Sequence, residues 1–144
     1  MRYEGQPRIW TVGRGYRLGQ LDAMHLEAFH QSEVFCMDER EQLNPWTVTA
    51  QVLQSIDRLL PEHSLKIVPT KYPMCRQAWE LEVEQDGRWL EVLAWGVFTD
   101  RIVRHVGGDP DKHTAIGIGQ GLERLAMLRY GIDDFRKIEA ARVA

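Results

Sequence analysis

Three glycines alternate with other residues near the C-terminal end of the chain, at Gly117, Gly119 and Gly121. This alternation indicates a strand whose backbone is approached closely from one side. Arg124 follows in the first turn of a helix-like stretch, so its side chain can point over the sheet. A permanently charged, fork-shaped donor above a glycine-lined sheet suits a polyphosphate, and an ordinary helix-surface arginine is the alternative.

A second group of residues alternates at Phe29, Gln31 and Glu33. In a strand, these three side chains share one face of the sheet. Phe29 could stack on a base, and the oxygens of Gln31 and Glu33 could accept protons from an ammonium group. The alternative interpretation places Phe29 in the core and Glu33 in a surface ion pair.

Glu91 is a carboxylate inside an apolar run at residues 89–97, which also contains Gly96. A carboxylate in such a strand is costly unless it is paired or bound to a metal. Magnesium beside a nucleotide would suit Glu91, because Mg²⁺ takes carboxylate oxygens together with phosphates. A salt bridge to an arginine is the alternative, and Gly96 would leave room beside the strand.

Arg17, at the end of an N-terminal strand, completes the set of candidate binding residues. Arg17 and Arg124 would bracket a sheet face that carries an aromatic ring, an amide, a carboxylate and several glycines. This is an inventory for binding a nucleotide and an amine together. Cys36 and Cys75 have no CxxC spacing and the five histidines have no zinc-ligand spacing, so we expect two reduced thiols and no zinc site.

A mainly antiparallel sheet must position these residues. Asn44 and Pro45 begin a helix that Pro61 stops. Asp86 and Gly87 supply the tight turn of a β-hairpin. The predicted strands are residues 8–16, 29–37, 65–68, 79–84, 89–97 and 117–121, with a loop at 17–27. The predicted helices are residues 45–60, 101–106, 122–130, with Gly131 as its C-terminal cap, and 133–142.

The fold class that follows is α+β, an antiparallel sheet with flanking helices, in one domain over residues 1–144. The net charge of −3 gives no basic surface of the kind that nucleic-acid-binding domains usually carry. The first seven residues are polar, which argues against a signal peptide, and no apolar run is long enough to cross a bilayer. We therefore expect a cytoplasmic protein with no membrane partner.

Three groups of motifs match one known family. Residues 13–33 contain G-R-x-Y-R, D-A-x-H and F-H-Q-x-E, and residues 117–136 contain G-L-E-R-L-A-M-L and Y-G-I-D-D. Residues 89–96, 103–107 and 109–110 match between them. With these motifs the chain resembles the catalytic module of the class II aminoacyl-tRNA synthetases, specifically the alpha subunit of phenylalanyl-tRNA synthetase, over nearly its whole length.

The resemblance implies a role for each matching residue. Arg17 and Arg124 would be the catalytic arginines, on the α-phosphate and the γ-phosphate side of ATP. The resemblance further implies an ATP site with His25 near the phosphates, Phe29 against adenine and Gly121 beside them, and an amino-acid site made of Gln31, Glu33, Tyr72, Met74, Gly96 and Gly117. Glu91 would be a Mg²⁺ ligand, so ATP and Mg²⁺ are the expected cofactors. The implied reaction is attack of a carboxylate on the α-phosphate, which gives an aminoacyl-adenylate and pyrophosphate.

The sequence also departs from the family pattern. We expect the family's first motif and its N-terminal tRNA-binding arm to be absent, which makes the chain a truncated paralogue. The family's ATP-contacting Glu is Gly19 here, and an acidic residue beside the aromatic pocket is Arg76. Gly117 replaces a pocket alanine and is expected to enlarge the pocket, while Trp95 would fill it if its indole points inward. Tyr72-Pro73-Met74 stands where the family has Phe-Pro-Phe, and Ala94 replaces a glycine.

The leading hypothesis is ATP-dependent activation of an amino acid or related carboxylate. The acyl group would pass to an acceptor protein or small molecule, with tRNA possible by the resemblance. The alternatives are a non-catalytic module that binds an amino acid or nucleotide, and one half of a split synthetase. Because the usual dimer helix is expected to be absent, apolar sheet surface should be exposed, and we expect a homodimer.

Overall fold

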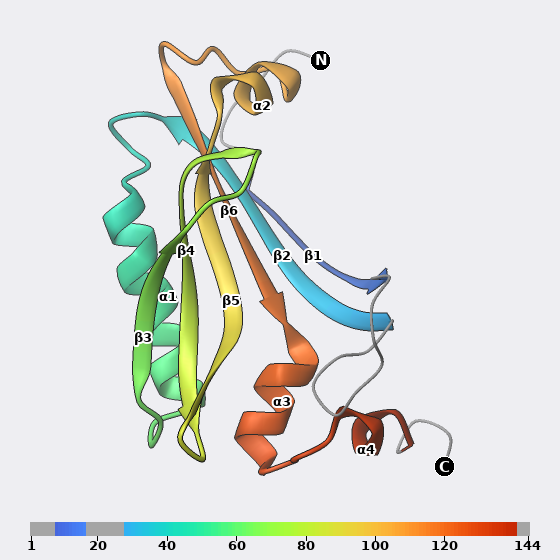
Figure 1. Ribbon diagram of the computed structural model, residues 1–144. Helices are drawn as coiled ribbons and strands as arrows, with labels where there is room; N and C mark the ends of the chain where they lie inside the picture. The colour runs from blue at the N-terminus through green and yellow to red at the C-terminus, as the bar shows by residue number, and fades with distance from the viewer. Residues whose placement is uncertain (1–7, 17–27, 141–144) are drawn as a thin grey trace.

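The computed structural model describes residues 8–16 and 28–140. Within them, a six-stranded antiparallel sheet has the order β1-β2-β6-β5-β4-β3, with helices packed against it (Figure 1). The strands are β1 (Arg8–Tyr16), β2 (Ala28–Glu39), β3 (Leu65–Thr70), β4 (Cys75–Gln85), β5 (Arg88–Phe98) and β6 (His113–Gly121). The helices are α1 (Pro45–Leu59), α2 (Asp100–His105), α3 (Leu122–Tyr130) and α4 (Phe135–Ala140). The predicted α+β class is confirmed.

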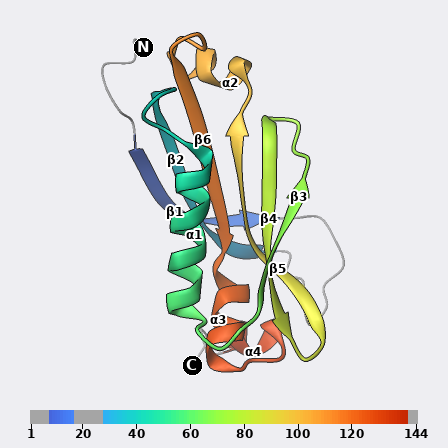
Figure 2. The same cartoon turned by 90° about the vertical axis from the view of Figure 1, so that its left-hand side faces the viewer.

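Helix α1 covers one face of the sheet, as Figure 2 shows. It begins as the sequence predicts, because the side chain of Asn44 accepts a hydrogen bond from the Trp46 amide and Pro45 occupies the first helical turn. Val52 and Ile56 on its inner side are 7% and 3% exposed and belong to the main hydrophobic core. The sheet contributes Leu81, Val83, Val92, Leu93 and Trp95 to that core.

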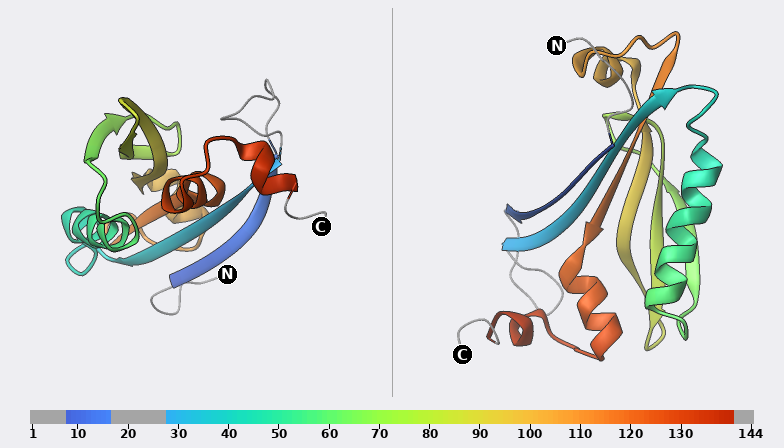
Figure 3. Two further views of the ribbon diagram at one scale, coloured as in Figure 1. Left: turned by 90° about the horizontal axis from the view of Figure 1, so that it is seen from below. Right: turned by 180° about the vertical axis from the view of Figure 1, so that it is seen from behind.

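The shorter helices lie at opposite ends of the sheet, α2 at one end and α3 with α4 at the other (Figures 1 and 3). Val103 of α2 packs with Met37 and Ala115 in a second, smaller cluster. Gly131 ends α3 in the left-handed conformation, with φ of 64°, as predicted for its C-terminal cap. Leu125 and Leu128 of α3 belong to the same core as α1, whereas Val103 of α2 packs on the opposite face of the sheet.

The strands β4 and β6 each begin four residues earlier than predicted, at Cys75 and His113, and the other differences in the described boundaries are one or two residues. β6 begins at His113, four residues before the glycine run, because Thr114, Ala115 and Ile116 pair with β2. The last helix begins at Phe135, two residues later than predicted, and is described to Ala140. Residues 141–142 of the predicted range lie outside the described residues, as does the predicted loop at 17–27.

The pairing of β4 with β5 contains an irregularity with consequences for the site. Glu82 pairs with Glu91 and Leu81 with Leu93, so Val92 has no partner across this pair of strands. A bulge of this kind re-aims the side chains around it. Glu91 consequently shares a face with Glu80 and Glu82, while Leu93 and Trp95 face α1.

None of the helices in the described part of the chain is both long enough and apolar enough to span a membrane.

Candidate functional site

The face opposite α1 has a floor of small residues. Strand pairing places Glu33, Gly119 and Ala94 in one row across β2, β6 and β5, and Phe35, Gly117 and Gly96 in the next row. Gln31 stands one row further along, opposite Gly121. Because β6 and β5 contribute almost no side chains to this face, the side chains of β2 stand beside exposed backbone. The glycine alternation thus forms the floor that the sequence indicated.

A cleft of about 440 Å³ lies over this floor, and we call it the glycine cleft. Gln31, Glu33 and Phe35 line it from β2, and Tyr72, Met74 and Cys75 line it from the opposite wall. Neither Gln31 nor Glu33 forms a side-chain hydrogen bond or ion pair in the part of the chain that is described. The polar end of the cleft therefore has two acceptor groups that no other described residue engages.

Tyr72 is tied to the wall of the cleft by a hydrogen bond. Its hydroxyl donates to Glu80 Oε1 at 2.7 Å. Burial raises the pKa of the Tyr72 phenol well above its ordinary value, and the hydrogen bond to Glu80 and the negative charges of Glu80 and Glu91 raise it further. Tyr72 is thus a neutral donor at neutral pH, held at the side of the glycine cleft.

Two consecutive residues at the start of α3 reach in different directions. The buried Glu123 accepts hydrogen bonds from the backbone amide of His30, at 2.8 and 2.9 Å, and lies 2.8 Å from its ring Nδ1. Arg124 instead donates to the backbone carbonyl of Glu91, at 2.6 Å, and pairs with its carboxylate at 3.4 Å. Since β2 and β5 flank β6, Glu123 and Arg124 fix the helix start to both neighbours of its own strand.

Glu91 is not a buried carboxylate, contrary to the premise from sequence. Its side chain is 44% exposed because the bulge at Val92 turns it out of the core, and it forms the ion pair with Arg124 that was the alternative to a metal role. No cluster of three or more His, Cys, Asp or Glu side chains suited to a metal ion is present among the described residues. A single exposed carboxylate does fit a Mg²⁺ ion that takes its other ligands from phosphates and water, so this role stays a prediction.

Gly117 does not enlarge the cleft, and that expectation was wrong. A methyl group on Gly117 would lie 2.5 Å from Cζ of Phe98, so the Phe98 ring occupies the space beside it. Trp95 does not fill the cleft with its indole either. Its indole N–H donates to Thr49 of α1 at 2.9 Å and its side chain lies in the core beneath that helix.

The remaining ATP-site residues are only partly described. Arg17 and His25 lie outside the described residues. The ring of Phe29 packs on Gly15 of β1, one row beyond Gln31. Gly121 is the N-cap residue of α3, and a methyl group there would have only the Val92 carbonyl nearby, 4.0 Å away. Stacking of adenine on Phe29 and phosphate binding at Gly121 stay predictions.

The two cysteines are free, as predicted. Both are partly rather than fully buried, and burial raises the pKa of each thiol.

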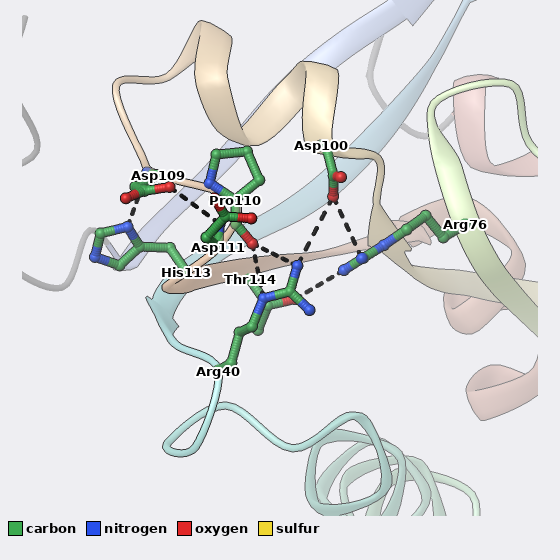
Figure 4. A network of polar contacts seen from close by, with 8 residues as sticks. All are labelled: Arg40, Arg76, Asp100, Asp109, Pro110, Asp111, His113 and Thr114. Carbon is green, nitrogen blue, oxygen red and sulfur yellow. Dashed lines mark hydrogen bonds and ion pairs between the residues drawn. The ribbon is translucent and has the colours of Figure 1, made fainter.

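Arg76 lies on the other side of the sheet, away from the glycine cleft. Together with Arg40, Thr114, Leu43 and Pro45 it lines a second cleft of about 460 Å³ beside the start of α1, which we call the arginine cleft. Figure 4 shows both guanidinium groups turned toward Asp100. Arg76 lies 3.3 Å from Asp100 Oδ1 and Arg40 lies 3.9 Å from it, while Arg40 also donates to the Pro110 carbonyl. These groups join the end of β2 and the start of β4 to the start of α2 and to the segment before β6.

Sequence reasoning missed three residues that shape the site: His30, Glu123 and Phe98. The pair His30 and Glu123 is separated by 93 positions, and no local pattern connects its members. Phe98 could have been identified from the sequence. Its large ring follows Gly96 by two residues, and the glycines of the neighbouring strand leave the space that such a ring needs.

Residues 1–143 match the model of the family described as "tRNA synthetases class II core domain (F)". The phenylalanine–tRNA ligase alpha subunit of Nostoc punctiforme is 34% identical over 141 residues, which cover 97% of this chain and 42% of that protein. The corresponding subunit of Aeromonas hydrophila is 36% identical over 140 residues, which cover 94% of this chain and 42% of that protein. The chain thus spans about two fifths of the length of these curated relatives.

Proposed function

Because the chain belongs to the family of class II tRNA synthetase core domains, we propose that it activates an amino acid or related carboxylate with ATP. The observation that carries this proposal is the glycine cleft. Gln31 and Glu33 stand beside a floor made of Gly119, Gly121 and Ala94. Acceptor groups for an ammonium ion thus lie next to backbone that a flat or charged ligand can approach closely.

In the proposed reaction, the carboxylate of the acid attacks the α-phosphorus of ATP. The bond from that phosphorus to the bridging oxygen breaks, and an acyl-adenylate and pyrophosphate form. Gln31 and Glu33 would accept the ammonium protons and so fix the carboxylate in line with the phosphate. Most of the rate enhancement would come from this positioning and from neutralisation of phosphate charge.

The ATP-binding roles are proposals on the family motifs. Arg17 and His25 would hold the α-phosphate end, Phe29 would stack on adenine, and Arg124 with Gly121 would meet the terminal phosphates. Glu91 would hold Mg²⁺, which when bound supplies positive charge to the phosphate oxygens. Tyr72, Met74, Gly96 and Gly117 would border the acid.

The acyl acceptor is also part of the proposal. The net charge of −3 supplies no generally basic surface for tRNA. We therefore place an acceptor protein or a small nucleophile before tRNA as the recipient of the acyl group.

The test of activation is acid-dependent exchange of pyrophosphate into ATP, measured over all standard amino acids and a set of non-standard carboxylic acids. Wild-type protein should show exchange with at least one acid. Arg124→Ala should lower that exchange by about 100-fold, as expected for loss of one donor to developing charge. Arg129→Ala on the same helix, where the side chain is exposed, is the matched control and should leave exchange unchanged.

The alternatives give different results in the same assay. Calorimetric binding of ATP or an acid without exchange would indicate a binding module, which is the second candidate. Exchange that appears only after a partner chain is added would indicate a split enzyme. Absence of both binding and exchange at millimolar ligand would contradict the proposed function.

Self-association as a homodimer is proposed on the exposed surface of β1. This edge strand leaves Trp10 and Val12 exposed on one face, at 69% and 48%, and Ile9 exposed on the other, at 56%. An exposed apolar edge strand of this kind favours association. Light scattering should give twice the monomer mass for wild type and a smaller value for Trp10→Lys. A monomer at high wild-type concentration would contradict this part of the proposal.

A further inference from the structure

The floor of the glycine cleft is open at one end and filled at the other. A methyl group on Gly117 would lie 2.5 and 2.8 Å from two ring carbons of Phe98, and one on Gly96 would lie 2.8 Å from the Cys75 sulfur. By contrast, a methyl group on Gly119 would meet only the end of the Gln31 side chain, at 3.3 Å. The chain's own side chains therefore occupy the floor over Gly117 and Gly96, and open floor remains at Gly119 and beyond.

Phe98 is held firmly in this position. Its ring stacks on Phe35 with centroids 5.7 Å apart and planes inclined by 29°. Both rings pack against Met37, Val103 and Ala115, which are fully buried. The residue after Phe98 is fixed as well, because the Thr99 amide donates to the Met74 carbonyl at 2.9 Å. Phe98 is thus part of a packed wall and cannot swing aside without disturbing this cluster.

The distance from the polar end to this wall is short. Glu33 stands in the row of Gly119, and Phe98 covers Gly117 in the adjacent row. Neighbouring positions on one face of a strand are separated by about 7 Å, and the atoms at each end take up part of that length. An acid held at Gln31 and Glu33 therefore has room along the floor for only a few carbon atoms before it meets the Phe98 ring.

We propose that Phe98 sets the size of the acid, so that the glycine cleft selects a short aliphatic amino acid, of the size of alanine to valine, over one with an aromatic side chain. This inference rests on the proposed function only in taking the glycine cleft as the acid-binding site. It assigns a specificity-determining role to a residue outside the predicted amino-acid site, and it reverses the expectation that Gly117 widens the pocket.

The test measures equilibrium binding rather than turnover. Glycine, alanine, valine, leucine and phenylalanine, each in the presence of an ATP analogue whose α,β-bridging oxygen is replaced by a methylene group so that no reaction occurs, are titrated calorimetrically into wild-type protein and into Phe98→Val. Wild type should bind alanine or valine at least tenfold more tightly than phenylalanine. Phe98→Val should raise affinity for leucine and phenylalanine by about 10- to 100-fold, the range that one or more methylene groups make in an apolar pocket.

Two further variants separate size selection from general loosening. Val83→Ala loosens the core on the α1 side of the sheet, which does not contain Phe98, and should leave the order of preference unchanged. Gly117→Ala alone should lower the melting temperature, because its methyl group collides with the Phe98 ring. The double variant Gly117→Ala with Phe98→Val should recover it, and it serves as the folded test protein if Phe98→Val alone unfolds.

The outcomes are distinct. Tighter binding of phenylalanine than of alanine and valine by wild type, or an unchanged preference in both Phe98 variants, would overturn the inference. Size-ordered binding without pyrophosphate exchange would support the inference while contradicting catalytic activation. Lack of binding by every acid, in wild type and variants alike, would overturn the acid site and this inference with it.

Discussion

The glycine cleft and the arginine cleft lie on opposite faces of one sheet and have nearly equal volumes, about 440 and 460 Å³. They differ in what their polar groups do. Arg40 and Arg76 are already engaged with Asp100, and Arg40 also with the Pro110 carbonyl. Gln31 and Glu33 have no such partners among the described residues.

Whether the polar groups of a cleft already have partners says more about the role of that cleft than its volume or its charge does. Two arginines in a cleft suggest an anion site, yet here they join four chain segments to one another. Polar groups that are engaged within the protein contribute to stability, and groups that are not engaged remain available to a ligand. We therefore expect changes in the glycine cleft to alter activity and changes in the arginine cleft to alter the free energy of unfolding.

The largest effect is expected for Glu33→Gln. A hydrogen bond to a charged group contributes roughly 1.5–3 kcal/mol, so loss of the carboxylate should lower pyrophosphate exchange by about 10- to 100-fold. The free energy of unfolding should change by less than about 0.5 kcal/mol, because Glu33 is an exposed surface residue. Glu39→Gln, also exposed and on β2, is the control. If Glu33→Gln lowered the free energy of unfolding but kept full pyrophosphate exchange, Glu33 would contribute to stability and not to activity. That result would contradict the proposed division between the two clefts.

Within the glycine cleft, Gly96→Ala and Gly119→Ala should behave oppositely. A methyl group on Gly96 would lie 2.7 Å from the backbone carbonyl of Gln77, which cannot easily move, whereas one on Gly119 meets only a flexible side chain. Overpacking of this kind costs about 1–3 kcal/mol, so Gly96→Ala should lower the denaturant midpoint clearly. Gly119→Ala should leave the midpoint nearly unchanged but weaken ligand binding. Equal denaturant midpoints for Gly96→Ala and Gly119→Ala would show that the floor tolerates a methyl group equally at both positions. They would contradict the distinction between its filled end and its open end.

In the arginine cleft, Arg40→Ala should cost about 1–2 kcal/mol of unfolding free energy, since it leaves the carbonyl of the buried Pro110 without its donor. Arg101→Ala on α2, where the side chain is exposed, should cost much less. A double-mutant cycle on Arg76 and Asp100 should give only about 0.2–1 kcal/mol, because both side chains are more than one third exposed. If Arg40→Ala lowered pyrophosphate exchange per folded molecule, the arginine cleft would take part in the reaction, contrary to our expectation.

The smallest effect concerns the ionisation of Tyr72. Its pKa is raised in the folded protein by burial and by Glu80, so its contribution to stability is complete below the unfolded pKa of about 10 and is lost as pH rises above that value. A spectrophotometric titration should show a late ionisation step from Tyr72, well above a pH of about 10. Tyr72→Phe should remove the late step, and ionisation of all tyrosines near pH 10 would contradict the assignment.

Much of the fold could be predicted from local patterns. Asn44 and Pro45 start α1, Asp86 and Gly87 turn the hairpin, and Gly131 ends α3, because each of these requires only neighbouring residues. The family resemblance was predicted from motifs and is confirmed by the match over residues 1–143.

The orientation of side chains in the site could not be predicted in the same way. Simple alternation along β5 puts Glu91 on the same face as Trp95, and the bulge at Val92 separates them. Whether Gly117 opens a pocket depends on where the Phe98 ring lies, and that is decided by packing against Phe35. These features depend on contacts between distant strands, which a local pattern does not contain.

The Arg124–Glu91 pair has a consequence for the kind of ligand that can displace it. The two charges, 3.4 Å apart, are already balanced, so the site presents little net charge to an approaching ion. A lone anion that takes Arg124 leaves Glu91 without its counter-ion, whereas a ligand that brings its own cation can exchange partners with both residues at once. In the proposed ATP site, the pair would therefore favour a metal-complexed polyphosphate over bare phosphate.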